Sequence, residues 1–215
     1  MHYLFIKKQT ISICLLICCS LVPQAFAQTS TNTVRATPVA PVASKTRAEN
    51  YPKQIQVEGV KLNLNGMGTR YKAIFKVYDM GLYTSTKAST LQEVINSPGP
   101  KKLEFVALRD LSTTDLGRLF YQGIKENCTP AQYQKHAASA LRISEVASGR
   151  AKILAGESFS LEFVPGKGLT FSIMDKPQGA PIGDAEFFAM VLGIWMGPVP
   201  ADFMLKDALL AIPKN

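Results

Sequence analysis

Arg70 is a side chain that could hold an anion, although its place beside Lys72 and Lys76 on the polar face of the strand after Gly66-Met67-Gly68 by itself favours a solvated cation. A guanidinium stays charged at physiological pH and can fork onto a carboxylate or an enolate. Tyr78 stands eight positions later and carries a hydroxyl, and by itself it is read as a packed, hydrogen-bonded tyrosine of the strand. On one straight strand the two side chains would share a face but lie about 26 Å apart. They can converge only if the strand bends strongly or if its first residues belong to a turn.

A β-hairpin is the element expected to position these residues. Leu62 and Leu64 alternate with polar residues, which is the period of a half-buried strand. The glycines of the 66–68 segment then predict the tight turn, with Arg70 at the start of the return strand. The apolar positions change parity further along this strand, which predicts a bulge near Tyr78-Asp79.

The first 27 residues have the pattern of a secretory signal peptide. Lys7 and Lys8 precede an apolar run over 11–22, and Ala25-Phe26-Ala27 forms a small-x-small cleavage site. Cleavage after Ala27 predicts a periplasmic or secreted protein without a transmembrane segment in the mature chain. Residues 28–50 are rich in Thr, Ser, Ala and Pro and are expected to form a flexible tether. Residues 51–215 are enough for one domain with a sizeable core.

The mature chain would keep few residues for metal or redox chemistry. Cleavage removes Cys14, Cys18 and Cys19, so Cys128 stays as the only cysteine and His136 as the only histidine. This excludes an internal disulfide, a CxxC motif and a histidine-rich metal site, and we expect no metal and no cofactor.

The charge balance favours anionic partners. Loss of the signal peptide leaves 22 basic against 16 acidic residues, a net charge of about +6. Such a surplus suits anionic surfaces or ligands. The basic residues are scattered along the chain and the protein is expected to be exported, so no nucleic-acid partner is predicted.

The rest of the chain predicts an α+β domain, an antiparallel sheet with helices layered on one face. Strands are expected over 54–58 and 102–108, and a second hairpin over 158–174 has a Pro-Gly-Lys-Gly turn. Capping signals at Ser112, Thr129 and Asp184 each predict the start of a helix. Further helices are expected over 91–95 and in the C-terminal ADFMLKDALLAIP segment. Phe187, Phe188 and Trp195 lie on the third capped helix and could wall an apolar pocket, although core packing is the default role of such aromatics.

Three segments together resemble the chalcone isomerase-like family, in particular its bacterial branch with a secretion signal. They are the Gly-x-Gly-x-Arg ending at Arg70, the Tyr-Asp-x-Gly-Leu-Tyr of residues 78–83, and Gly-Pro-Val-Pro at 197–200 before a C-terminal helix. The resemblance covers roughly residues 54–213. It implies an open-faced β-sandwich of the chalcone isomerase type, with a ligand cleft between the sheet and the helices.

The resemblance also implies two sets of site residues. In the catalytic members an arginine stabilises the anion, while tyrosine and asparagine orient the substrate, and Arg70, Tyr121 and Asn127 match these positions. In fatty-acid-binding relatives an arginine and a tyrosine grip the carboxylate, which points to Arg70 with Tyr78, and to Tyr121 as a further ligand-binding residue.

Three functional hypotheses follow. The first is a binding module for a small apolar anion that resembles a fatty acid, with Arg70 as its anchor. The alternative is an isomerase, an intramolecular lyase that acts on a chalcone-like enone. The second alternative is a non-catalytic envelope protein that binds a partner and whose cleft is filled by side chains. We favour the first because it needs the fewest residues that the sequence does not supply.

Overall fold

The computed structural model describes residues 50–212. Its strands are β1 (Gln54–Val57), β2 (Val60–Lys72), β3 (Phe75–Thr84), β4 (Lys101–Ala107), β5 (Leu111–Ser112), β6 (Lys152–Ile153), β7 (Ser158–Val164), β8 (Gly168–Ile173) and β9 (Lys176–Pro177). Its helices are α2 (Leu91–Asn96), α3 (Thr113–Glu126), α4 (Pro130–Ala147), α5 (Ala185–Met196) and α6 (Phe203–Leu209). The predicted signal peptide and all but the last residue of the predicted tether lie outside the described residues. Within 50–212, no helix is both long enough and apolar enough to cross a bilayer.

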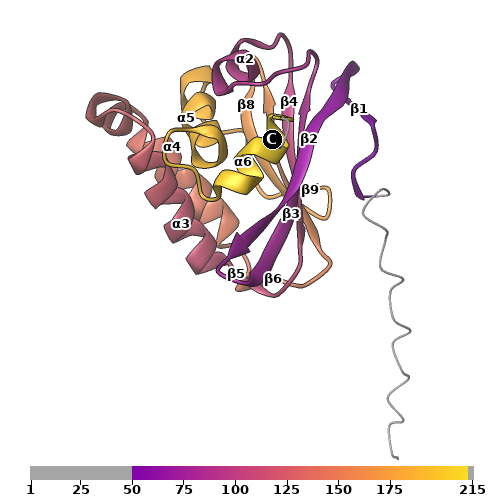
Figure 1. Cartoon of the computed structure of the whole chain (residues 1–215). Helices are drawn as coiled ribbons and strands as arrows, with labels where there is room; N and C mark the ends of the chain where they lie inside the picture. Colours follow the sequence, from indigo (N-terminus) through magenta and orange to yellow (C-terminus); the bar gives the residue numbers. More distant parts are fainter. Residues whose placement is uncertain (1–49, 213–215) are drawn as a thin grey trace, which may run out of the picture. The chain divides into compact units, whose positions relative to one another are not determined.

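One antiparallel sheet organises the domain. Its seven strands have the order β1-β2-β3-β4-β7-β8-β9, and β5 pairs with β6 apart from it. The sheet curls, and the helices cover its concave face (Figure 1). The main core lies between these layers, where Phe105 and Leu161 of the sheet and Leu192 of α5 are all buried. The predicted α+β class, an antiparallel sheet with helices on one face, is confirmed.

The turn of the first hairpin is not at the glycines, so that prediction was wrong. Strand β2 continues through Gly66 and Gly68 and reverses only at residues 73–74, where Lys72 pairs with Phe75. The glycines make room for α6, which lies across this part of the sheet (Figure 1). A Cβ atom at Gly66 would lie 2.2 Å from the carbonyl oxygen of Ala208, closer than two non-bonded atoms can approach.

Two irregularities shape the hairpin. Asn65 is an extra residue in β2, and its amide donates to the carbonyl oxygens of Ala88 and Leu209 at 2.8 Å each. Its Oδ1 atom accepts from the Ala88 N–H, also at 2.8 Å. In β3, Val77 is left without a partner between the Arg70–Tyr78 and Tyr71–Lys76 pairs. A bulge was predicted near Tyr78-Asp79, and it lies one residue earlier.

The other elements follow the sequence patterns. Thr129 and Gln132 form the predicted capping box of α4, while Ser112 and Asp184 cap α3 and α5 through their side chains. The predicted second hairpin is formed by β7 and β8, with Phe163 opposite Leu169. Local signals therefore located these elements correctly.

Candidate functional site

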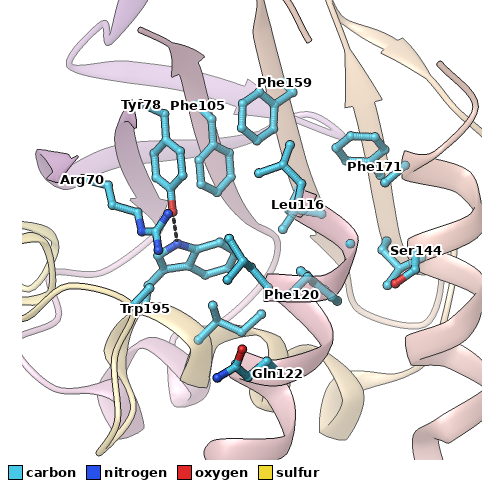
Figure 2. Close-up of a pocket in the computed structure, with 18 of the residues that line it drawn as sticks. Arg70, Tyr78, Phe105, Leu116, Phe120, Gln122, Ser144, Phe159, Phe171 and Trp195 are labelled. Carbon is cyan, nitrogen blue, oxygen red and sulfur yellow. Dashed lines mark hydrogen bonds between the residues drawn. The ribbon is translucent and has the colours of Figure 1, made fainter. Parts of the chain in front are cut away.

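An apolar cavity of about 300 Å³ lies between the concave face of the sheet and helices α3, α4 and α5. This volume is at the lower end of the range of about 300–1,000 Å³ that is typical of small-molecule sites. Figure 2 shows Arg70, Tyr78 and Trp195 together at one side of the cavity and Phe171 and Ser144 at the other. The site is therefore a mainly apolar chamber with the Arg70 guanidinium, the Tyr78 hydroxyl and the Trp195 indole N–H on one side.

Arg70 is the cation of this polar end. Its Nε atom is buried and has no hydrogen-bond partner, and its Cζ atom lies 5.6 Å from the centre of the Tyr78 ring. A buried guanidinium N–H without an acceptor is costly, and native proteins rarely leave one unpaired. Within residues 50–212, no carboxylate forms an ion pair with Arg70. The side chain thus has hydrogen-bonding capacity in reserve for an anion.

The hairpin brings Arg70 and Tyr78 together. They are direct partners across β2 and β3, since the chain reverses between them. The separation of about 26 Å expected for a straight strand therefore does not occur. The glycine pattern predicts the turn at residues 66–68, but with the turn at residues 73–74 the two side chains need no strong bend to converge.

Tyr78 is held by Trp195 of α5. The indole Nε1–H donates to the Tyr78 hydroxyl oxygen at 2.8 Å, and both side chains are buried. An indole N–H can only donate, so the tyrosine oxygen accepts here and keeps its own proton for another acceptor. Burial raises the pKa of Tyr78, while the nearby Arg70 and the bond from Trp195 lower it less strongly. The hydroxyl is therefore a neutral donor at physiological pH.

The Asp202 carboxylate near Tyr78 forms no ion pair with Arg70 among residues 50–212. Asp202 is the N-cap of α6, where its Oδ1 atom accepts from the N–H groups of Met204 and Leu205. Its Oδ2 atom accepts from the Tyr71 N–H at 2.9 Å. Both oxygens are thus occupied by backbone donors, which hold α6 against the end of β2.

Aromatic and aliphatic side chains form the rest of the chamber. Phe105 and Phe159 stack with their ring centres 4.6 Å apart, and Phe171 packs against Phe159 at 6.4 Å. Leu116 and Phe120 of α3 face them across the cavity (Figure 2). The arrangement can hold an apolar body whose one charged or polar end reaches Arg70.

The cavity opens between α3 and the loop after α5. Its lining includes the exposed residues Gln122, Glu126, Val199 and Ala201. The Gln122 amide donates to the Glu126 carboxylate at 2.8 Å, so these two polar side chains bond to each other along one edge of the mouth.

Tyr121 and Asn127 do not join the Arg70–Tyr78 pair, and neither lines the cavity. Tyr121 is 42% exposed and makes an edge-to-face contact with Tyr133 of α4 at 5.5 Å. The Asn127 amide donates to the carbonyl oxygens of Gly123 and Val199 at 2.9 and 2.8 Å, and its Oδ1 atom accepts from the Val199 N–H. Asn127 therefore positions the loop at the mouth of the cavity.

Sequence reasoning missed the polar role of Trp195, its hydrogen bond to Tyr78. The apolar pattern of its helix predicts a packing role, and only the hydrogen bond to Tyr78 reveals the second one. The sequence did contain one indication of this role, because the N–H of a buried tryptophan usually donates to an acceptor.

Cys128 and His136, the cysteine and histidine of residues 50–212, lie outside the cavity lining. Burial raises the pKa of the Cys128 thiol, which disfavours the thiolate. The Nε2 atom of His136 lies 3.1 Å from the Glu186 carboxylate, between α4 and α5. In the part of the chain from 50 to 212, no group of three or more His, Cys, Asp or Glu side chains could hold a metal ion.

Comparisons with known proteins place this geometry in a family. The family model described as chalcone isomerase-like matches residues 43–211. The fold is also similar to the crystal structure of a fatty-acid binding protein of Arabidopsis thaliana, with a TM-score of 0.59 and 14% sequence identity over 78% of this chain and 95% of that one. No curated protein sequence matches the chain significantly. The family match covers most of the chain, and the protein therefore belongs to the chalcone isomerase-like family.

Proposed function

We propose that this protein is a binding module for a small apolar anion of the fatty-acid type. The observation that carries the proposal is the Arg70 guanidinium, whose buried Nε–H has no acceptor and which lines an apolar cavity. The similarity in fold to a plant fatty-acid binding protein supports the same class of ligand.

A carboxylate fits the polar end by its chemistry. It could accept from Arg70 Nε–H and one terminal N–H in a two-point contact, and from the Tyr78 hydroxyl as a third donor. Such bonds are stronger away from water, and the stacked rings of Phe105 and Phe159 keep this region apolar. Each methylene that leaves water for the chamber would add about 0.8 kcal/mol.

The isomerase alternative is less well supported by the geometry. It needs polar side chains that orient a carbonyl beside Arg70, and Tyr121 and Asn127 lie outside the cavity lining. The structural alternative needs a cleft filled by side chains, whereas about 300 Å³ is open. Both observations favour a ligand carrier or sensor.

Binding of a medium-chain acid such as dodecanoate tests the proposal. Trp195 is the only tryptophan of the chain and lines the cavity, so its fluorescence reports occupancy directly. We expect Arg70→Gln to weaken binding by about tenfold or more, because bonds to charged groups contribute about 1.5–3 kcal/mol. Native mass spectrometry of the purified protein should show a co-purifying acid that Arg70→Gln loses.

The matched control is Arg118→Gln, since the Arg118 side chain is 62% exposed on α3 and pairs with Asp115 at 3.7 Å. It should bind dodecanoate like the unaltered protein. Dodecanol, which has the same chain without the charge, should bind more weakly than the acid. Equal affinity for the acid and the alcohol, or for the unaltered protein and Arg70→Gln, would remove the basis of the proposal.

We propose in addition that the protein acts in the periplasm or outside the cell. The support is the signal-peptide pattern of residues 1–27. N-terminal sequencing of the protein recovered from its natural compartment should begin at Gln28. A mature protein that retains Met1 would contradict export by cleavage.

A further inference from the structure

Exposed apolar side chains stand in two segments that directly follow cavity-lining residues, one after Arg70 and one after Ala201. The end of the β2–β3 hairpin presents Ile74 and Phe75, which are 84% and 59% exposed. The start of α6 presents Phe203 and Met204, which are 64% and 63% exposed. Isolated apolar residues on a surface are normal, but a group of them beside a ligand site indicates an interaction surface. We call Ile74, Phe75, Val199, Phe203 and Met204 the mouth patch.

Contacts tie the two halves of the mouth patch together. The Tyr71 N–H donates to the Asp202 carboxylate at 2.9 Å, which joins the end of β2 to the residue before Phe203. Val199 is half-exposed, lines the cavity and stands four residues before Phe203 in the same loop. Val199 therefore belongs both to the patch and to the cavity lining, and Ala201 of the lining stands two residues before Phe203.

The surroundings of the mouth patch are basic. Residues 70–76 contain Arg70, Lys72 and Lys76 and no acidic residue. Arg109 lies 6.0 Å from the centre of the Phe75 ring. None of these four cations forms an ion pair with another residue of the described range 50–212. Three acidic neighbours accept hydrogen bonds: Asp110 and Asp202 from the Ala155 and Tyr71 N–H groups, and Glu126, at one edge of the mouth, from the Gln122 amide.

We infer that the mouth patch docks on the surface of an anionic lipid bilayer, so that the apolar acid passes between membrane and cavity without crossing water. Apolar side chains beside unpaired lysines and arginines suit this partner, because the first enter the acyl boundary while the second meet the head groups. The inference rests on the proposed function, since it names the source or destination of the ligand held at Arg70.

Vesicle binding by the protein as recovered from the cell tests the inference. We expect co-sedimentation with vesicles of equal parts phosphatidylcholine and phosphatidylglycerol, much weaker binding to phosphatidylcholine alone, and loss of binding as salt is raised. Lys72→Gln/Lys76→Gln should lower vesicle affinity by about fivefold for each lysine. Ile74→Ser/Phe203→Ser should lower it by more than about tenfold. Any contribution of the N-terminal residues is common to all variants and cancels in the comparison.

Leu141→Ser is the matched control for the apolar change, because Leu141 is 58% exposed on α4, outside the mouth patch. It should leave vesicle binding unchanged. Equal loss in this control, or equal binding to both kinds of vesicle, would overturn the inference.

Dodecanoate binding measured on the same variants separates the two proposals. The mouth-patch variants should keep their equilibrium affinity for free dodecanoate while taking up the acid from anionic vesicles more slowly. Dodecanoate binding without vesicle binding would overturn the membrane inference and leave the proposed function intact. Vesicle binding that survives in Arg70→Gln, together with no dodecanoate binding by any variant, would support the docking surface and overturn the proposed ligand.

Discussion

Replacement of Tyr78 by phenylalanine should separate the two roles of its hydroxyl, which accepts from Trp195 and, as proposed, donates to the ligand. The ring stays in place against Phe105, at 5.4 Å between centres, but the Trp195 indole N–H loses its acceptor while it is buried. An unsatisfied buried donor costs about 1–3 kcal/mol. For a chain of this size, about 2–4 °C of melting temperature correspond to each kcal/mol, so Tm should fall by about 2–12 °C.

The same change should weaken ligand binding separately. A carboxylate would lose one hydrogen bond from Tyr78, worth about 1.5–3 kcal/mol, so Kd for dodecanoate should rise by about ten- to 150-fold. Titration calorimetry measures this affinity, and urea unfolding followed by circular dichroism measures stability.

A double-mutant cycle with Trp195→Phe isolates the Trp195–Tyr78 bond. When both polar partners are absent, no donor is left unpaired, so the double variant should be more stable than the sum of the single losses predicts, by about 1–3 kcal/mol. Strict additivity, together with an unchanged Tm for Tyr78→Phe, would refute the role assigned to this bond.

Three other predictions concern the fold and the cavity. Gly66→Ala should destabilise the protein severely by urea unfolding, because the new Cβ atom would lie 2.2 Å from a backbone oxygen of α6, whereas Gly117→Ala meets its nearest atom at 3.6 Å and should be tolerated. Ser144→Phe should fill the end of the cavity away from Arg70 and reduce calorimetric affinity for long acids more than for short ones. Burial raises the pKa of both Tyr78 and Tyr83 above 10.0, so the unfolded chain loses these protons first and the free energy of unfolding should fall as pH rises above about 10. Flat stability up to pH 12 would contradict the last prediction.

Periodicity and capping were enough to predict the elements whose signals are local. Thr129 with Gln132 marks a helix start whatever packs against it, and the alternation in residues 158–173 defines a hairpin by itself. The glycines of β2 show that a local signal can also mislead. Glycine is typical of turns, but Gly66 is needed here because α6, more than a hundred residues later in the chain, packs directly against its backbone. A long-range contact of this kind leaves no local pattern.

The candidate site was predictable in part for the same reason. Arg70 and Tyr78 were identified by residue type and resemblance, and their convergence depended on where the hairpin turns. Tyr121 shows the limit of a motif on a helix, because one step around the helix separates a cavity-lining position such as Phe120 from an exposed one. The role of Trp195 depends on a bond across the sheet-helix seam, which no spacing in the sequence encodes.

The unpaired Nε–H of Arg70 also lowers the stability of the ligand-free protein. A methionine at this position would fill similar space without a buried donor, and should therefore make the ligand-free protein more stable while it abolishes anion binding. The natural residue is thus a compromise between persistence and activity, of the kind that keeps functional proteins below their greatest attainable stability. A screen that selected this domain for heat resistance alone would therefore be expected to replace Arg70, the residue on which anion binding depends.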